Sequence, residues 1–177
     1  MQLITYIIFN FIIYSFIGWI IELLYNYAIR KDFKKAGFLK GPYKPMYGIA
    51  VTILILCKEI FHFNSIIMLI LCFIVPSTIE YISGYLLKRF FNEVYWDYSD
   101  LKYNINGFVT LRFSIYWTVL SLIGIYIFQP YIYNNIFIKF YGTIHILTYV
   151  LISMFFVDLF AKISSKDIKK KQIVNWT

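Results

Sequence analysis

Long apolar runs alternate with short polar and basic segments along the chain. Uncharged runs cover residues 3–21, 65–79, 113–138 and 140–157. A transmembrane helix needs about 20 predominantly apolar residues, so these runs predict membrane spans. A further span, 45–63, has a shorter uncharged part and holds Lys58 and Glu59 near one end, where a long side chain can reach the membrane interface. The pattern predicts an all-α, polytopic membrane protein.

The long run after residue 113 is predicted to hold the end of one span and the approach to the next. Gln129-Pro130 and Asn134-Asn135 interrupt it, and such residues punctuate helical patterns. We therefore expect a bundle of about five transmembrane helices within one domain, residues 1–163, followed by a basic cytoplasmic tail, residues 164–177. The expected spans are 3–29, 45–63, 65–87, 108–128 and 140–163.

Composition and charge agree with this topology. Hydrophobic residues make up 60% of the chain and charged residues 15%, far from the usual mix of a soluble domain. With five spans, all of the 17 Lys and Arg except Lys58 and Lys139 fall on one side, which predicts an outside N-terminus and a cytoplasmic C-terminus. A four-span arrangement would divide the basic segments between the two sides. The net charge of +8 is then explained by basic loops that face anionic lipid, without nucleic acid.

Signals for processing or for a bound group are weak. The first basic residue is Arg30, so we expect the first span to be retained rather than cleaved. Cys57 and Cys72 lack the spacing of metal ligands. We predict no cofactor and no metal.

Two acidic residues, Glu22 and Glu80, interrupt apolar runs at matched positions. Each lies eight residues before the next basic residue, Arg30 or Lys88, which places both carboxyl groups at one depth, about 12 Å from the basic boundary at 1.5 Å per residue. A carboxyl group in a span is costly and is usually paired or functional. Two acids at one level also repel each other, and we expect Arg112 to supply a counter-charge. In both spans, small and polar residues recur at helical spacing on the face that carries the glutamate. Such a face indicates either helix packing or a cavity for a substrate or ion.

Two expected inner connections carry further candidates. Residues 37–48 contain two prolines and three glycines, which predicts a fixed turn, and residues 96–107 hold Trp-Asp-Tyr-Ser-Asp and Asn-Ile-Asn-Gly. Near the chain's end, Asp158 is expected to pair with Lys162, four residues on. Candidates for substrate binding or a transport path are Glu22, Glu80, Asp97, Asn104, Asn106 and Arg112. Candidates for partner docking or anion binding are Gly37, Lys40, Gly41, Pro42, Lys44, Pro45, Trp96 and Tyr98.

The order of these motifs over about residues 10–125 resembles a known family. The motifs are Gly18-Trp19-x-x-Glu22, Gly37-Phe38-Leu39-x-Gly41-Pro42-x-x-Pro45-x-Tyr47-Gly48, Glu80-Tyr81, Trp96-Asp97-Tyr98-Ser99 and Asn104-x-Asn106-Gly107. Together they resemble the bacterial ABC-transporter permease family of the CmpB type, ABC-transporter type IV. A basic residue usually follows the Asn-Gly pair in that family, whereas this chain has Phe108. The resemblance implies a membrane transport component and supplies no substrate or catalytic residue.

Three functions stay open at this point. The first is a permease-like component of the cell membrane with a polar site in the cytoplasmic half of the bilayer. Because the chain has no G-x-x-x-x-G-K-[ST] motif, it would require a separate ATPase, and its small size would require a second copy. The second is a membrane-embedded enzyme acting on a lipid-linked or anionic substrate, with Asp97 or Asp100 holding a divalent ion. The third is a structural or assembly subunit. Membrane lipid is an expected partner in each case.

Overall fold

The computed structural model describes residues 2–31 and 37–165, and most of them are helical. The first half of the chain forms α1 (Gln2–Arg30), α2 (Pro45–Glu59) and α3 (Ser65–Leu86), which continues through a π-helical turn, η1 (Leu87–Phe91). A small antiparallel hairpin follows, with β1 (Asn104–Ile105) and β2 (Val109–Thr110). The second half consists of α4 (Leu111–Ile123), η2 (Gly124–Phe128), α5 (Gln129–Ile132), η3 (Tyr133–Ile138) and α6 (Tyr141–Ser164).

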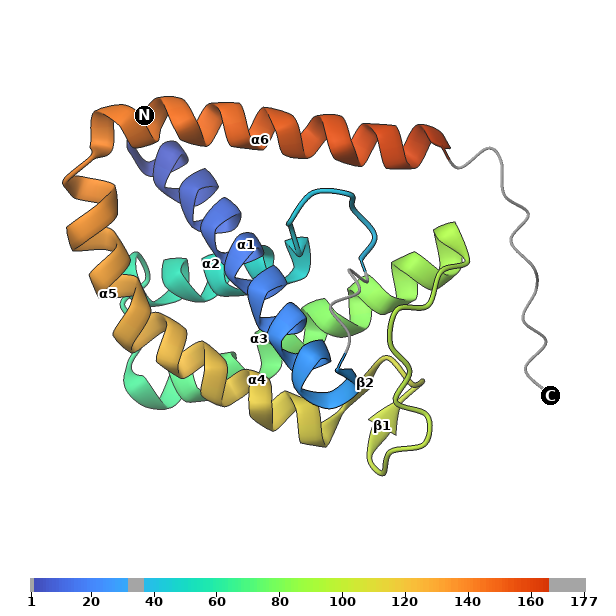
Figure 1. The fold of residues 1–177 in the computed structure, drawn as a ribbon. Coiled ribbons are helices and arrows are strands. Elements are labelled where there is room, and N and C mark those ends of the chain that lie inside the picture. Colours follow the sequence, from blue (N-terminus) through green and yellow to red (C-terminus); the bar gives the residue numbers. More distant parts are fainter. Residues whose placement is uncertain (1, 32–36, 166–177) are drawn as a thin grey trace.

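Successive helices run back and forth and form one bundle (Figure 1). α1 packs on α2, α2 on α3 and α3 on α4, while α6 lies across α1. The pairing of α1 with α2 is antiparallel, because Gly18 faces Tyr47 near one end and Tyr6 bonds to Glu59 near the other. The first residues of α1 and the last turn of α6 lie at opposite ends of the bundle, as an odd number of passes requires (Figure 1).

Within the described residues, four helices are long and apolar enough to cross a membrane, namely 2–28, 65–91, 111–138 and 141–164. The fifth, α2, has 15 residues and spans only about 22 Å at 1.5 Å per residue, short of a hydrocarbon core of about 30 Å. It begins at Pro45, a residue suited to the first helical turn, and ends at Glu59 rather than near residue 63. The fold is therefore an all-α, polytopic membrane bundle, as predicted.

The helix that starts at Leu111 does not end near residue 128 as expected. It continues through α5 and η3 to Ile138. Pro130 has no backbone N–H, and the π-helical turn just before it accommodates this loss, since the N–H of Gln129 bonds to the carbonyl of Gly124, five residues back. The Asn135 amide donates to the Tyr131 carbonyl of its own helix at 3.1 Å, so the asparagine pair also fits within the helix.

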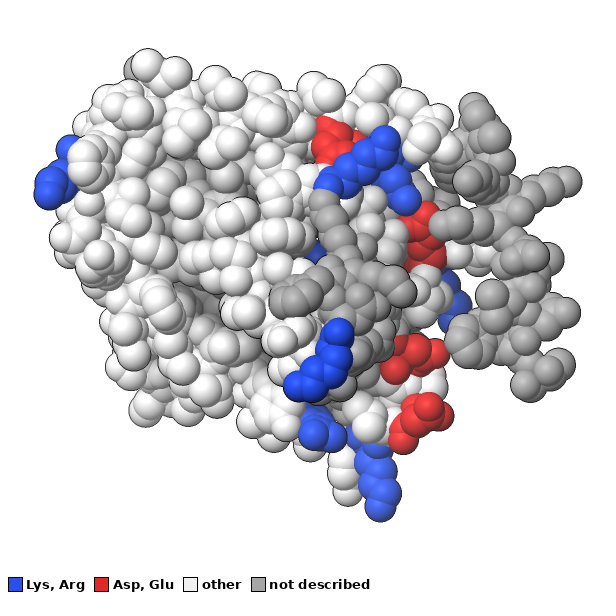
Figure 2. All heavy atoms as spheres, in the orientation of Figure 1, with Lys and Arg blue, Asp and Glu red and all other residues white. Residues whose placement is uncertain are grey.

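The surface divides into an apolar body and a charged end. Figure 2 shows most Lys, Arg, Asp and Glu side chains gathered at one end, with a basic side chain isolated at the opposite end. Large apolar residues stay exposed along the helices, for example Ile66 at 73% and Phe160 at 72%, as expected for faces that contact lipid rather than water. Which end is cytoplasmic remains a prediction from the charge asymmetry. The basic tail after residue 165 and Lys34 and Lys35 of the first connection lie outside the described residues.

Candidate functional site

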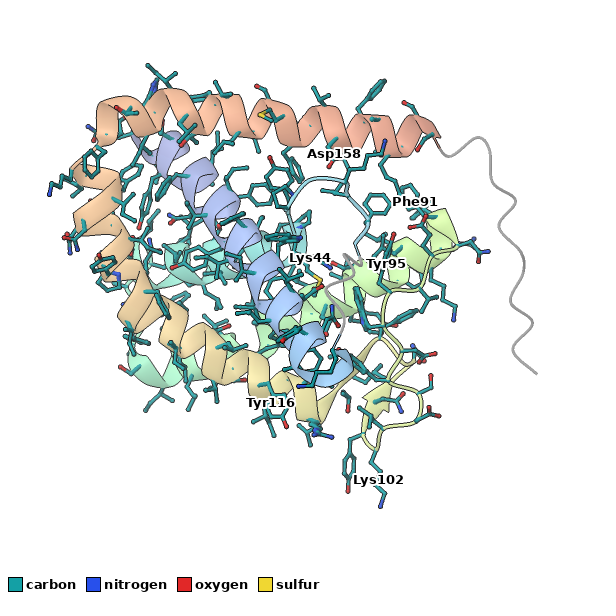
Figure 3. All side chains as sticks on the ribbon, viewed as in Figure 1. Lys44, Phe91, Tyr95, Lys102, Tyr116 and Asp158 are labelled. Carbon is teal, nitrogen blue, oxygen red and sulfur yellow. The ribbon has the colours of Figure 1, made fainter. Side chains whose placement is uncertain are left out.

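Six side chains near the charged end form what we call the inner polar cluster. Its members come from α1, α2, α3, α4 and the connections that precede α2 and β1: Glu22, Lys44, Tyr47, Glu80, Tyr98 and Trp117. Glu22 forms an ion pair with Lys44, and the side chain of Lys44 is only 13% exposed although it lies on a loop. Figure 3 shows Lys44 at the centre of this end of the bundle.

Glu80 is the buried acid of the cluster, with 2% of its surface exposed. The Tyr98 hydroxyl donates to its Oε1 at 3.1 Å, and the Trp117 indole N–H donates to its Oε2 at 2.9 Å. Burial and the neighbouring Glu80 carboxylate raise the pKa of the Tyr98 hydroxyl well above its ordinary value, so Tyr98 remains a donor. Both carboxylate oxygens therefore have a neutral donor, which is how a buried acid is stabilised without a cation.

Tyr47 joins the two acids. Its hydroxyl interacts electrostatically with both Glu22 and Glu80. The ring reaches this position because it packs directly over Gly18, where any Cβ would clash with it. It also packs edge-on against Trp117, with ring centroids 5.2 Å apart. The structure thus brings Glu22 and Glu80 into one cluster, and the two carboxyl groups interact electrostatically.

Arg112 lies outside the cluster. Its side chain is exposed, and its Nε donates to the Tyr116 hydroxyl on the same helix at 3.2 Å. The counter-charge for the acids comes from Lys44 instead, because the turn before α2 folds back onto α1, with the Lys44 N–H bonding to the Ser15 carbonyl at 3.0 Å.

The connection before α2 is held at both ends. Gly41 donates its N–H to Asp158 Oδ2 on α6 at 2.7 Å, so Asp158 does not form the expected pair with Lys162 (Figure 3). Lys162 bonds to Glu93 at 2.9 Å. Among the other loop candidates, Gly37 lies close to Lys44, Lys40 is exposed, Pro42 is half-buried and Pro45 begins α2.

The hairpin connection is a folded cap. Trp96 donates from its indole to the Phe108 carbonyl at 2.9 Å. Asn104 donates to the Leu101 carbonyl at 2.7 Å and accepts from the N–H of Gly107, which has a φ of +72°. The Asn106 amide donates to the Tyr81 hydroxyl on α3 at 2.9 Å. Asn104 and Asn106 therefore help to hold the cap in shape.

Asp97 is also part of this cap. Its Oδ1 accepts from the Ser99 hydroxyl at 2.6 Å and from the Ser99 N–H at 2.9 Å. These bonds, to the hydroxyl first and the N–H second, lower the pKa of the Asp97 carboxyl. Within residues 2–31 and 37–165, no group of three or more His, Cys, Asp or Glu side chains is placed to share a metal ion.

A second set of polar side chains, the outer polar cluster, lies deeper toward the opposite end of the bundle. Its members are Tyr6, Asn10, Tyr14, Glu59 and Gln129. Gln129, 1% exposed, is the centre: its amide nitrogen donates to Tyr6 at 2.6 Å and Asn10 at 3.1 Å, and its carbonyl accepts from Tyr14 at 2.7 Å. The Tyr6 hydroxyl in turn donates to Glu59 at 2.6 Å.

An apolar cavity of about 210 Å³ lies between the two clusters. α1, α2, α3 and the α4–η2 segment all contribute to its wall. Tyr14 of the outer polar cluster and Tyr47 and Trp117 of the inner polar cluster are among the lining residues. The rest of the lining is almost wholly apolar, with Pro76, Met46 and Phe128 among it.

Comparison with known families decides the assignment. The family described as Putative ABC-transporter type IV, of the CmpB type, matches residues 9–163. The chain belongs to this family. The match covers the inner polar cluster, the cavity and the outer polar cluster except Tyr6, so the resemblance predicted from residues 10–125 is confirmed over a longer stretch. Together with the four long apolar helices, it identifies a multi-pass membrane protein of the ABC-transporter class. No solved structure matches the chain.

Sequence reasoning missed the outer polar cluster of this ABC-transporter family member, although a signal was present. Tyr6, Asn10 and Tyr14 recur every four residues on one face of the first span. None is charged, so none stood out as costly in a membrane, and Gln129 was interpreted as part of a helix break.

Proposed function

We propose that this chain is the membrane-spanning component of an ABC-type transporter in the cell membrane, and that the inner polar cluster forms part of its transport path in the cytoplasmic half of the bilayer. A separate chain supplies ATP hydrolysis, because no nucleotide-binding G-x-x-x-x-G-K-[ST] motif occurs in the sequence. The family to which the chain belongs supports the transporter assignment.

One observation carries the proposal: each of the two connections at the charged end bonds to one of the two acids. Lys44, from the connection before α2, pairs with Glu22. Tyr98, from the hairpin connection, donates to Glu80. A partner that docks on these connections and moves them therefore changes the surroundings of both carboxyl groups at once.

Such a movement would alter what the path attracts. With Lys44 in place, the charge of Glu22 is neutralised, and the donors on Glu80 satisfy its oxygens. Withdrawal of Lys44 and Tyr98 would leave two carboxyl groups in surroundings of low dielectric, where a cationic or hydrogen-donating solute is strongly favoured. ATP-driven movement of the loops thus becomes a change in affinity along the path.

The transporter requires two copies of this chain. The cavity in a single bundle measures about 210 Å³, below the usual range of about 300–1,000 Å³ for a small-molecule site. A path wide enough for a solute would lie between two bundles, with an inner polar cluster on each side.

Copurification tests the proposal. The chain, expressed in its native host and extracted in gentle detergent, is expected to bring down an ATPase and a second copy of itself. Replacing both acids, Glu22→Gln with Glu80→Gln, should leave that assembly intact and abolish stimulation of ATP hydrolysis. The matched control is Asp100→Asn, an exposed acid at the same end of the bundle, which should behave as wild type.

Two outcomes would overturn it. If the chain is monomeric and no ATPase copurifies with it under these conditions, the transporter proposal is contradicted. Full cellular function of the double glutamine variant would show that the inner polar cluster is not part of the transport path and would leave it a structural role.

A further inference from the structure

Among the described residues, the cavity between the two polar clusters is least closely packed on the side between α1 and α4. α1 packs along α2 and α6, and α4 packs along α3. Along the described residues, α1 and α4 do not pack closely on each other, although both line the cavity. The cavity therefore has an open side between α1 and α4.

The two ends of this opening are fixed by specific contacts. Near the charged end, the rings of Tyr25 on α1 and Phe113 on α4 meet with centroids 6.3 Å apart. Toward the other end, the Tyr14 hydroxyl donates to Gln129 at 2.7 Å. Between these contacts, cavity-lining residues of the α4–η2 segment are exposed, for example Leu120 at 39% and Phe128 at 52%.

The surroundings of the opening are hydrocarbon. α1 and the helical run 111–138 are two of the four helices long and apolar enough to span a bilayer, and the opening lies within both. Small residues in the cavity wall, Ala50, Ser121 and Gly124, leave the space. Water has almost no polar partner there, and apolar cavities of this kind stay dry.

The cavity is large enough to hold part of a hydrocarbon chain. An engineered apolar cavity of about 150 Å³ binds benzene, so a cavity of 210 Å³ holds a hydrocarbon segment larger than that. The Tyr14 hydroxyl and the Trp117 indole N–H already bond to Gln129 and Glu80, so these side chains offer their ring surfaces to the cavity.

We propose that the cavity is a lipid-chain site: one hydrocarbon chain of a membrane lipid enters from the bilayer between α1 and α4 and fills the space between the two polar clusters. The remainder of the lipid stays in the bilayer along α1 and α4. This site is independent of the transport proposal, because it needs neither an ATPase nor a second copy.

Photolabelling of the full chain in nanodiscs tests the site. One arm uses a phosphatidylglycerol with a diazirine in the middle of an acyl chain, and the other uses a prenyl phosphate with a diazirine in the chain. Mass spectrometry should locate adducts at Met46, Ile79 and Ser121, and an excess of the unlabelled lipid should compete with them at least fivefold. Labelling of the lipid-facing α6 residue Phe160 should follow only the mole fraction of the probe.

A cavity-filling variant provides the second readout. Ser121→Leu places a larger side chain in the cavity and should lower adducts at Met46 and Ile79 at least fivefold. Ser153→Leu, the same change at an exposed position on α6, should leave them unchanged. Labelling by one probe alone identifies the chain type and supports the site.

Absence of competition at the cavity residues with both probes would overturn the proposal. So would equal labelling of Met46 and Ile79 in the two leucine variants. The competition experiment uses the wild-type chain, so it decides the question even if Ser121→Leu does not fold.

Discussion

The two polar clusters of this bundle are built by opposite strategies. The inner polar cluster contains two carboxyl groups and one amine, Glu22, Glu80 and Lys44, and takes two of its six side chains from connections outside the helices. The outer polar cluster is centred on a neutral amide, Gln129, and takes all its side chains from α1, α2 and α5. The first ties the helices to the connections, whereas the second ties the helices to one another.

This difference predicts how much stability the protein loses when a side chain of either cluster is replaced. A buried charge that loses its partner is expensive, so the inner polar cluster depends on every member being in place. A neutral hydrogen bond between membrane helices contributes about 0.6 kcal/mol on average and about 1.7 kcal/mol at most, so the outer polar cluster loses stability in small steps. An ion pair suits a site that a partner can change, and a network centred on an amide suits a fixed one.

The largest effect is expected from Lys44→Met, which leaves the Glu22 carboxylate without its cation. The free energy of unfolding in detergent should fall by about 2.5 kcal/mol, below the range for a fully buried pair because the Glu22 side chain is 27% exposed. Adding Glu22→Gln should restore most of the loss, because the unpaired charge is then gone. Lys40→Met, at an exposed position of the same connection, is the control and should change stability by less than about 0.5 kcal/mol.

If the doubly substituted protein is no more stable than Lys44→Met alone, the contribution of Lys44 is packing rather than charge. The contrast drawn between the two clusters would then fail at its main point.

The next largest effect is expected from Gln129→Leu. Three hydrogen bonds are lost, and at the values measured between membrane helices their sum is about 2 kcal/mol. Denaturant titration of the purified chain measures it. Asn135→Leu removes an amide that bonds only within its own helix, at an exposed position, and should cost less than about 0.5 kcal/mol. Equal losses in these two variants would show that the outer polar cluster does not join the helices.

A smaller and local effect is expected from Gly107→Ala. The residue has a φ of +72°, and a Cβ there would lie 2.6 Å from both Asp97 Oδ1 and Ser99 Oγ. Strain of this kind costs about 1 kcal/mol or more, and it should increase hydrogen exchange in the hairpin without affecting the outer polar cluster. Gly142→Ala is the matched control, since a Cβ at Gly142 meets nothing within 4 Å. Unchanged hydrogen exchange at the Tyr98 amide would show that strain in the cap does not reach the inner polar cluster.

The smallest effect concerns pH. The Ser99 hydroxyl and N–H lower the pKa of the exposed Asp97 carboxyl in the folded protein. Stability from these bonds is therefore present above the unfolded pKa of the aspartate and is lost as the pH falls through the folded value. Ser99→Ala should raise the pKa of Asp97, as measured by NMR of labelled aspartate carboxyl groups. Ser165→Ala, whose hydroxyl bonds to a backbone carbonyl at the end of α6, should not.

The acids of the inner polar cluster could be predicted from the sequence, because a carboxyl group within an apolar run is conspicuous. Glu22 and Glu80 were expected at one depth, and the structure brings them together through Tyr47. Their cation could not be identified, because Arg112 and Lys44 both lie near a span end and only the folded turn decides between them. The family and the all-α membrane bundle followed from motif order and from the length of the apolar runs.

Hydrogen bonds between segments that lie far apart in the sequence could not be predicted. Nothing in the local sequence shows that Gln129 bonds to residues more than 100 positions earlier, or that Asp158 accepts from Gly41. Local rules assigned Gln129-Pro130 to a break and Asp158 to a pair with its neighbour Lys162. In both cases tertiary contacts supplied a partner that the local pattern does not contain.

The π-helical turn at Gly124–Phe128 has a consequence for the phase of the helix beyond it. A π turn holds one residue more than the α-helix it replaces, so every later side chain is rotated by about 100° relative to an uninterrupted helix. Gln129 faces the interior because of that surplus residue. Deleting one residue from this turn would shorten the helix by a single step and leave Gln129 facing the interior, because the remaining residues then fit an α-helical turn.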